Sequence, residues 1–147
     1  MIPLREGLGW RDLPPRQLAY LGDAVWELYV RQQLLGSTPD QDVLHARKVA
    51  LVHAPAQARA LRALMDGLDP EELDVVRRAR NLKGSVPRHR SVSDYRHGTA
   101  FEALLGKAYL EARPDRLRIL LEQAYVHAQL PAGVSPDGAD RVPEESP

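Results

Sequence analysis

Helix-start signals recur along this chain and leave little room for other secondary structure. Two segments, Thr38 to Gln41 and Asp69 to Glu72, have the pattern of a capping box, in which the N-cap residue and the third helical residue satisfy each other's backbone N–H groups. Pro15, Pro55 and Pro114 each precede apolar residues at helical spacing, and proline is favoured in a first turn. No segment alternates apolar and polar residues between hairpin turns. We therefore predict an all-α fold.

The same signals place the individual helices. The first is expected from near Pro15 to just before Gly36, a favoured C-terminal stop. A third helix is expected to end near Gly67. Prolines mark the first turns of four later helices, at positions 39, 55, 70 and 114. The remaining helix is predicted to begin with Ser93 as its N-cap. Between them, residues 81–92 are predicted to form a loop, because glycine and proline interrupt the helical pattern there.

Length and composition suit one globular domain. The chain has 147 residues, of which 44% are hydrophobic and 27% charged. We assign residues 1–130 to a single domain. Residues 131–147 contain four prolines, two glycines, four acids and one base, so we predict a disordered acidic tail.

Residue types that the chain lacks exclude several classes of function. There is no cysteine, which rules out disulfides, thiol catalysis and iron–sulfur ligation. No apolar run approaches the roughly 18 residues that a membrane span requires, and no apolar segment follows the N-terminal arginine as in a signal peptide. We expect a cytoplasmic protein without membrane contact.

The charges balance overall but are segregated along the chain. Twenty basic and twenty acidic residues give no net charge, yet residues 77–96 contain seven basic residues and one acid. Such a block indicates contact with a polyanion, although a merely solvated helix and loop would show the same charge pattern.

Glycines inside two predicted helices mark a candidate site. Gly22 lies in the middle of the first helix beside Asp23, and Gly98, Glu102 and Gly106 are spaced four and four along one face of a later helix. If these glycine faces meet, Asp23 and Glu102 come together in a narrow crevice. Two carboxylates at close range repel unless a cation lies between them, and oxygen-only ligands suit Mg²⁺. The competing interpretation is that the glycines only allow close packing and that the acids pair with arginines.

Both motifs resemble those of a known family. Residues 21–25, Leu-Gly-Asp-Ala-Val, are similar to the signature helix of ribonuclease III, and residues 101–106, Phe-Glu-Ala-Leu-Leu-Gly, are similar to its second acidic motif. The stretches 18–27, 76–81 and 95–102 resemble in particular the short bacterial Mini-ribonuclease III branch. The resemblance covers about residues 14–128.

This resemblance implies a function in some detail. It implies an all-α endonuclease domain that forms a homodimer and cuts both strands of an RNA duplex with Mg²⁺, leaving 5′ phosphate and 3′ hydroxyl ends. Asp23 and Glu102 would be the catalytic, metal-binding acids. The branch lacks a separate double-stranded-RNA-binding domain and matures the ends of the 23S ribosomal RNA precursor, in which a ribosomal protein is a candidate helper. Larger members have further acids where this chain has Ala19 and Thr99, which leaves the number of metal ions open.

A domain without a helper module must bind RNA through its own surface. The basic block is the obvious source, since arginine suits bidentate phosphate contacts. The residues predicted to bind RNA are Arg80, Lys83, Arg88, Arg90 and Arg96.

Two alternatives remain at this stage. One is a relative that binds duplex RNA without cleaving it, with Ala19 and Thr99 as signs of lost activity. The other is a helical protein–protein module in which the glycines serve only dimer packing. Trp26, Tyr29 and Tyr109 are expected in the core or at a dimer contact rather than under RNA bases.

Overall fold

The computed structural model describes residues 2–129, and within that range it is helical with no strand. The predicted all-α class is therefore confirmed for the described part, whereas the predicted disordered tail, residues 131–147, lies outside it. The six α-helices are α1 (Pro15–Leu34), α2 (Gln41–Val52), α3 (Ala54–Leu64), α4 (Pro70–Arg80), α5 (Val92–Leu110) and α6 (Pro114–Ala128). Two 3-10 turns, η1 (Trp10–Asp12) and η2 (Met65–Gly67), precede α1 and α4. None of the described helices is long and apolar enough to cross a membrane.

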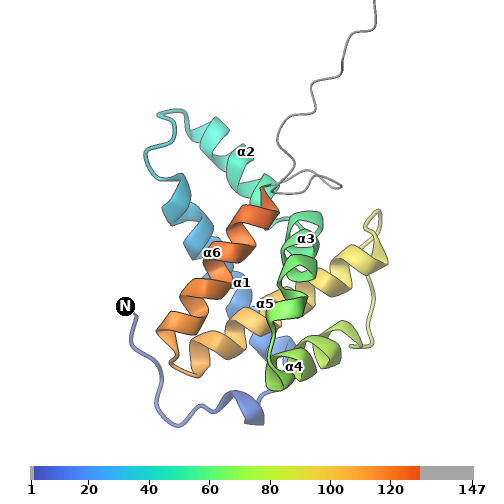
Figure 1. The fold of residues 1–147 in the computed structure, drawn as a ribbon. Coiled ribbons are helices and arrows are strands. Elements are labelled where there is room, and N and C mark those ends of the chain that lie inside the picture. The colour runs from blue at the N-terminus through green and yellow to red at the C-terminus, as the bar shows by residue number, and fades with distance from the viewer. Residues whose placement is uncertain (1, 130–147) are drawn as a thin grey trace, which may run out of the picture.

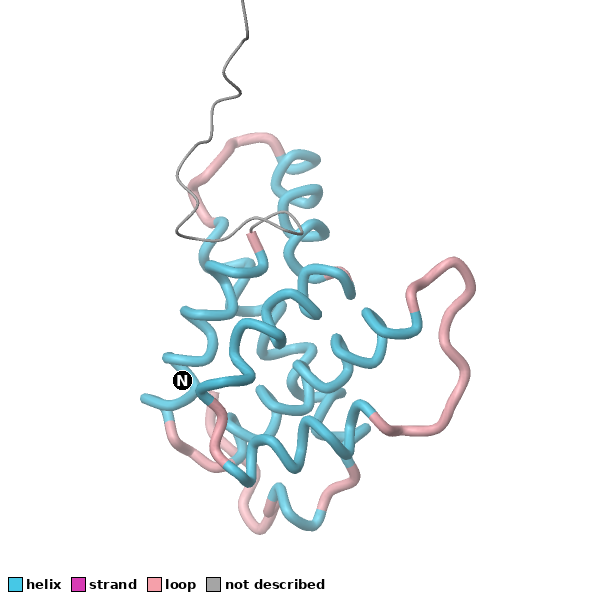
Figure 2. The backbone as a smooth tube through the Cα atoms, turned by 45° about the vertical axis from the view of Figure 1, so that its right-hand side comes forward, coloured by secondary structure: helices cyan, strands magenta, loops and turns pink. Residues whose placement is uncertain are grey.

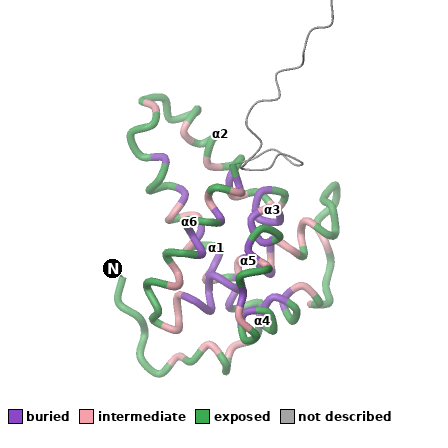
Figure 3. Tube along the Cα trace, in the orientation of Figure 1, coloured by how far each residue is buried: buried purple, intermediate pink, exposed green. Residues whose placement is uncertain are grey.

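Helix α5 forms the centre of the fold (Figure 1). It packs most extensively on α1 and is covered further by α3, α4 and α6. Nine consecutive or near-consecutive residues of α5 between Gly98 and Ala108 are buried, which fits a helix surrounded by others. Helix α2 is different, since Leu51 is its only buried residue and most of its length is exposed (Figure 3).

One tryptophan connects three of these helices. Trp26 of α1 is fully buried, and its ring lies edge-on to Phe101 of α5 with centroids 5.1 Å apart. Its indole N–H donates a hydrogen bond of 3.1 Å to the carbonyl oxygen of Leu51 in α2. The expectation that Trp26 belongs to the core is confirmed. The hydrogen bond gives the indole nitrogen, the only polar atom of this buried side chain, a partner.

The helix starts follow the predicted chemistry, with two shifts. The capping box at Asp69 and Glu72 is present in both directions, with distances of 2.8 and 2.9 Å. The predicted box at Thr38 is wrong, because Asp40 is the N-cap of α2. Its carboxylate accepts from two backbone N–H groups, those of Asp42 and Val43, whereas a hydroxyl at position 38 offers a weaker acceptor.

The start of α5 is shifted in the same way. Ser91 rather than Ser93 is its N-cap, and the Ser91 hydroxyl accepts from the N–H of Asp94 at 3.2 Å. The loop between α4 and α5 is therefore residues 81–91. It extends away from the helices on one side of the molecule (Figure 2).

Candidate active site

Glycines set the distance between α1 and α5. A methyl group at position 22 would overlap the backbone carbonyl oxygen of Glu102, and one at position 106 would overlap that of Leu18. Only hydrogen fits at both positions, so the two backbones touch where the helices cross. The expected meeting of Gly22 with the Gly106 end of the α5 motif is thus found.

Gly98 has another neighbour than expected. It faces α3 instead of α1, and a Cβ there would lie 2.9 Å from the Oε1 atom of Gln57 and 3.7 Å from Ala54. The spacing of four and four places three residues along one side of α5, but that side is wide enough to contact two helices. Gly98 therefore makes room for a polar side chain of α3.

The close crossing brings the two acids to one cavity. Asp23 is exposed and Glu102 is half-buried, and both line a cavity of about 300 Å³ between α1, α5 and the 81–91 loop. The remaining lining residues come from α1, α4, α5 and the loop: Arg16, Ala19, Tyr20, Ala79, Leu82, Gly84, Ser85, Val86, Tyr95, Arg96 and Thr99.

The electrostatics of this cavity disfavour two free carboxylates. Burial, and after it the charge of Asp23, raise the pKa of Glu102 to about 8, although the Gln57 side chain opposes the rise as a hydrogen-bond donor. Burial also raises the pKa of Asp23, and the charge of Glu27 adds to this while Lys48 opposes it. Without a cation, Glu102 therefore keeps its proton at neutral pH.

Glu27 lies one turn after Asp23 but is already neutralised. Its carboxylate accepts from Arg31 at 2.6 Å and from Lys48 at 3.1 Å. Both hydrogen bonds lower the pKa of Glu27, so it stays ionised within this small network. Asp23 and Glu102 are consequently the two acids of the cavity that have no basic ion-pair partner among residues 2–129.

The donor set fits a hard divalent cation with few protein ligands. No group of three or more histidines and acids that could hold a metal ion occurs among the described residues. Ala19 and Thr99 line the cavity, and the Thr99 hydroxyl donates to the carbonyl oxygen of Tyr95 at 3.1 Å. Two carboxylates facing a cavity with room for water suit Mg²⁺, which keeps several waters in its octahedral shell.

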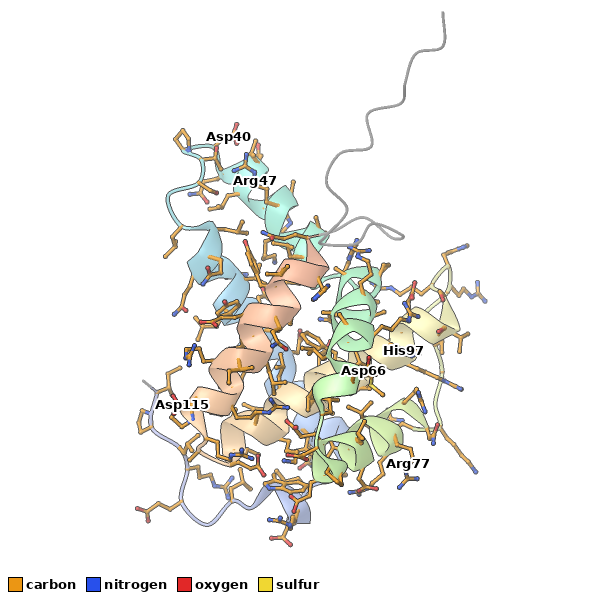
Figure 4. The ribbon with its side chains drawn as sticks, viewed as in Figure 1. Asp40, Arg47, Asp66, Arg77, His97 and Asp115 are labelled. Atoms are coloured by element: carbon orange, nitrogen blue, oxygen red, sulfur yellow. The ribbon has the colours of Figure 1, made fainter. Side chains whose placement is uncertain are left out.

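The structure brings only one of the predicted RNA-binding residues, Arg96, into the lining of this cavity, and the others lie on α4 and on the loop that borders it. Arg80 ends α4, and Lys83, Arg88 and Arg90 are exposed on the loop. Within the described chain none of the five takes part in an ion pair, whereas Arg77 nearby is paired with Asp74 at 2.6 Å. Loop side chains extend outward, and Arg77 lies on the outer side of α4 (Figure 4). The unpaired charges favour a polyanion contact over a self-neutralised surface.

Sequence reasoning missed two residues that shape the site. Arg16 holds the loop onto α1, because its guanidinium donates to the carbonyl oxygen of Lys83 at 2.6 Å and lies against Gly84. Its spacing from Tyr20 and Asp23 on one helix face is the signal that would have found it. Gln57 comes from α3, and no motif in the sequence connects it with Glu102.

Comparisons with known proteins agree with this arrangement. The ribonuclease III domain family matches residues 16–113. A Mini-ribonuclease 3 of Gloeobacter violaceus is 45% identical over 129 residues, covering 86% of this chain and 95% of its own length. A Mini-ribonuclease 3 of Symbiobacterium thermophilum is 45% identical over 115 residues, covering 76% and 88%. The crystal structure of a Fusobacterium nucleatum protein superposes with a TM-score of 0.71 at 32% identity, covering 76% of this chain and 91% of that one.

A helical domain with two acids at a glycine-spaced crossing, matched to this family over most of its length, defines the class of protein. The chain belongs to the ribonuclease III family and is an endoribonuclease. Within that family it groups with the short Mini-ribonuclease 3 proteins, which match nearly their whole length to it.

Proposed function

We propose that this enzyme cleaves double-stranded RNA with Mg²⁺ held by Asp23 and Glu102. The observation that carries the proposal is the position of both acids in one cavity that Arg96 also lines and that the 81–91 loop borders through Leu82, Gly84, Ser85 and Val86. A site for phosphodiester hydrolysis needs negative ligands for a cation and positive side chains for the flanking phosphates. Both are present within one face of the domain.

The two acids have unequal roles in this scheme. Asp23 is exposed and meets the incoming phosphate first, while Glu102 is half-buried and fixed to α5 at the helix crossing. Together they would hold the Mg²⁺, which would supply an acidified water and neutralise charge on the phosphate oxygens. The protein's part is to hold the two carboxyl groups at a fixed separation, which the close contact between Gly22 and α5 achieves. A bound cation would favour the ionised form of both.

Duplex RNA is recognised by its shape, phosphates and 2′-hydroxyls. Arg80, Lys83, Arg88, Arg90 and Arg96 supply phosphate contacts in the proposed complex. Arg16 supports them indirectly, since its hydrogen bond to the Lys83 carbonyl fixes where the loop leaves α4. In the proposed complex the loop lies along the RNA sugar–phosphate backbone beside the scissile bond.

The exposed face of α1 suits a two-fold homodimer. Tyr20 is 84% exposed and Leu28 is 49% exposed, and with Ala24 they form an apolar row one turn apart beside Asp23. Pairing this face with its copy would bury the row and place two cavities near one duplex. Leu18 and Trp26 of the same helix are buried in the core and take no part in this face.

The biological substrate that we propose is the 23S ribosomal RNA precursor stem, in the cytoplasm. This rests on the resemblance to the Mini-ribonuclease III branch and is the finer part of the proposal. Assays on the bare stem and on the stem bound to large-subunit ribosomal proteins would establish whether a ribosomal-protein helper is needed.

The test uses the full chain on long duplex RNA with Mg²⁺, and with EDTA as the metal-free control. Asp23→Asn and Glu102→Gln should each abolish cleavage while duplex binding remains within about twofold, because the loop is untouched. Binding without cleavage in the wild type would favour the non-cleaving relative instead. Absence of both binding and cleavage would favour the protein–protein module, and cleavage retained by both variants would refute the metal site.

A further inference from the structure

Gln57 is a buried amide beside the proposed metal-binding acid. It lies in the first half of α3 and is only 2% exposed, among alanines and leucines of the same helix that are also buried. Its backbone N–H is satisfied by the carbonyl of His53 at 3.2 Å. A glutamine side chain offers two N–H donors and one acceptor, and burying them without partners costs about 1–3 kcal/mol. A plain packing position in this core would be filled by leucine or methionine.

The contact with Gly98 fixes how the amide is oriented. The Oε1 atom of Gln57 lies where a Cβ on Gly98 would come within 2.9 Å of it, so the absence of a side chain at position 98 makes the space. With the oxygen directed at the α5 backbone, the amide nitrogen is the atom left for a partner. Glu102 is one helical turn beyond Gly98 on α5, which places its carboxyl group beside the Gln57 side chain, and hydrogen bonding by Gln57 lowers the pKa of that group.

From this geometry we infer that Gln57 is a positioning residue for Glu102: its amide N–H holds one carboxylate oxygen and leaves the other directed into the cavity for the metal. The inference rests on the proposed function, because it assumes that Glu102 is a metal ligand. A neutral donor suits this task. Lysine or arginine in its place would neutralise the carboxylate and weaken its attraction for a cation.

The position also explains how two carboxylates can suffice. Groups that orient metal ligands by hydrogen bonds contribute about 10–100-fold to metal affinity. The cavity has Ala19 and Thr99 near the acids, so no further carboxylate restrains Glu102 from α1 or from its own helix. The restraint comes from α3 instead, through a residue that packs in the space at Gly98.

The test compares metal binding and stability in the full-length protein without RNA. Mn²⁺ binding is measured from the paramagnetic resonance signal of the free ion, and unfolding is followed by urea denaturation in EDTA. Gln57→Met keeps the volume and removes the donors. It should weaken Mn²⁺ binding about tenfold or more, while the unfolding midpoint stays the same or rises because a buried polar group has been removed. Gln57→Asn keeps the amide but shortens its reach, so it should weaken binding similarly.

Two control variants separate the outcomes. Leu64→Val, in the same helix, should lower stability without changing Mn²⁺ affinity. Glu102→Gln should abolish the site. Wild-type affinity in Gln57→Met would overturn the positioning role while leaving the proposed function standing, and so would a stability loss in Gln57→Met with unchanged affinity. Failure of the wild type itself to bind Mn²⁺ would overturn both proposals.

Discussion

Gly22 of α1 lies against the backbone carbonyl of Glu102 in α5, and the absence of a side chain at position 22 fixes the place of the acid at position 102. Asp23 is the next residue along α1. The same contact that brings the helix backbones together therefore determines the separation of the two carboxylates. Both the packing of the two helices and the placement of the two acids therefore require glycine at position 22.

Gly22→Ala should consequently impair both stability and cleavage. The methyl group would overlap a backbone atom that cannot rotate away, so α1 and α5 must separate, at a cost of about 3 kcal/mol or more. Urea denaturation measures the loss. Gly67→Ala is the matched control, because a Cβ there meets nothing within 4 Å, and its effect should lie within about ±0.5 kcal/mol. Equal stability of the two variants would contradict the close crossing.

The sequence predicted the helices, apart from two of their starts, and indicated that Gly22 and Gly106 could meet, because glycine in a helix interior is costly and is typical of a close approach. It was insufficient for Gly98, since spacing along one helix does not say which neighbour covers each part of its face. Asp40 and Ser91 show a similar limit at helix starts. Several residues near each start can cap, and the one with the best acceptor geometry is settled only by the chain's path. Gln57 was missed because its relation to Glu102 exists only in three dimensions.

The raised pKa of Glu102 predicts a pH-dependent stability in the absence of metal. Because its pKa is about 8 in the folded protein and ordinarily 4.5, the folded state retains a proton that the unfolded chain releases between these values. Stability should therefore fall as pH rises from about 5 to 8, by up to about 1.4 kcal/mol per pH unit. Denaturation in EDTA at several pH values measures this. Glu102→Gln should flatten the profile, and parallel profiles for the two proteins would show that the carboxyl group is not the cause.

The apolar row on α1 predicts the oligomeric state. Light scattering of the full chain at micromolar concentration should give twice the 16.4 kDa chain mass. Tyr20→Asp combined with Leu28→Asp should give monomers, because charges would then be buried at the contact. Leu35→Asp is the control, since Leu35 is 73% exposed beyond the end of α1 and lies outside the row. A wild-type monomer, or dissociation by the control alone, would refute this interface.

The loop between α4 and α5 makes a prediction about salt. Replacing Lys83, Arg88 and Arg90 by glutamine should weaken binding to all duplex sequences alike, because phosphate contacts carry no sequence information. The dependence of log affinity on log salt should become shallower by up to about two to three units if each side chain releases one counterion. Cleavage of bound RNA at low salt should fall much less, since Asp23 and Glu102 are unchanged.

A second triple variant tests whether position or charge is responsible. Replacing Arg5, Arg113 and Arg118 by glutamine removes the same charge from exposed positions outside the loop. Its general electrostatic effect should be small at moderate salt, because separated surface charges are screened beyond about 10 Å. Affinities at three salt concentrations for the wild type and both variants decide the matter. If the two triple variants share one slope, net charge governs RNA binding and the loop has no special part in it; if only the loop variant differs, the loop lies on the phosphates.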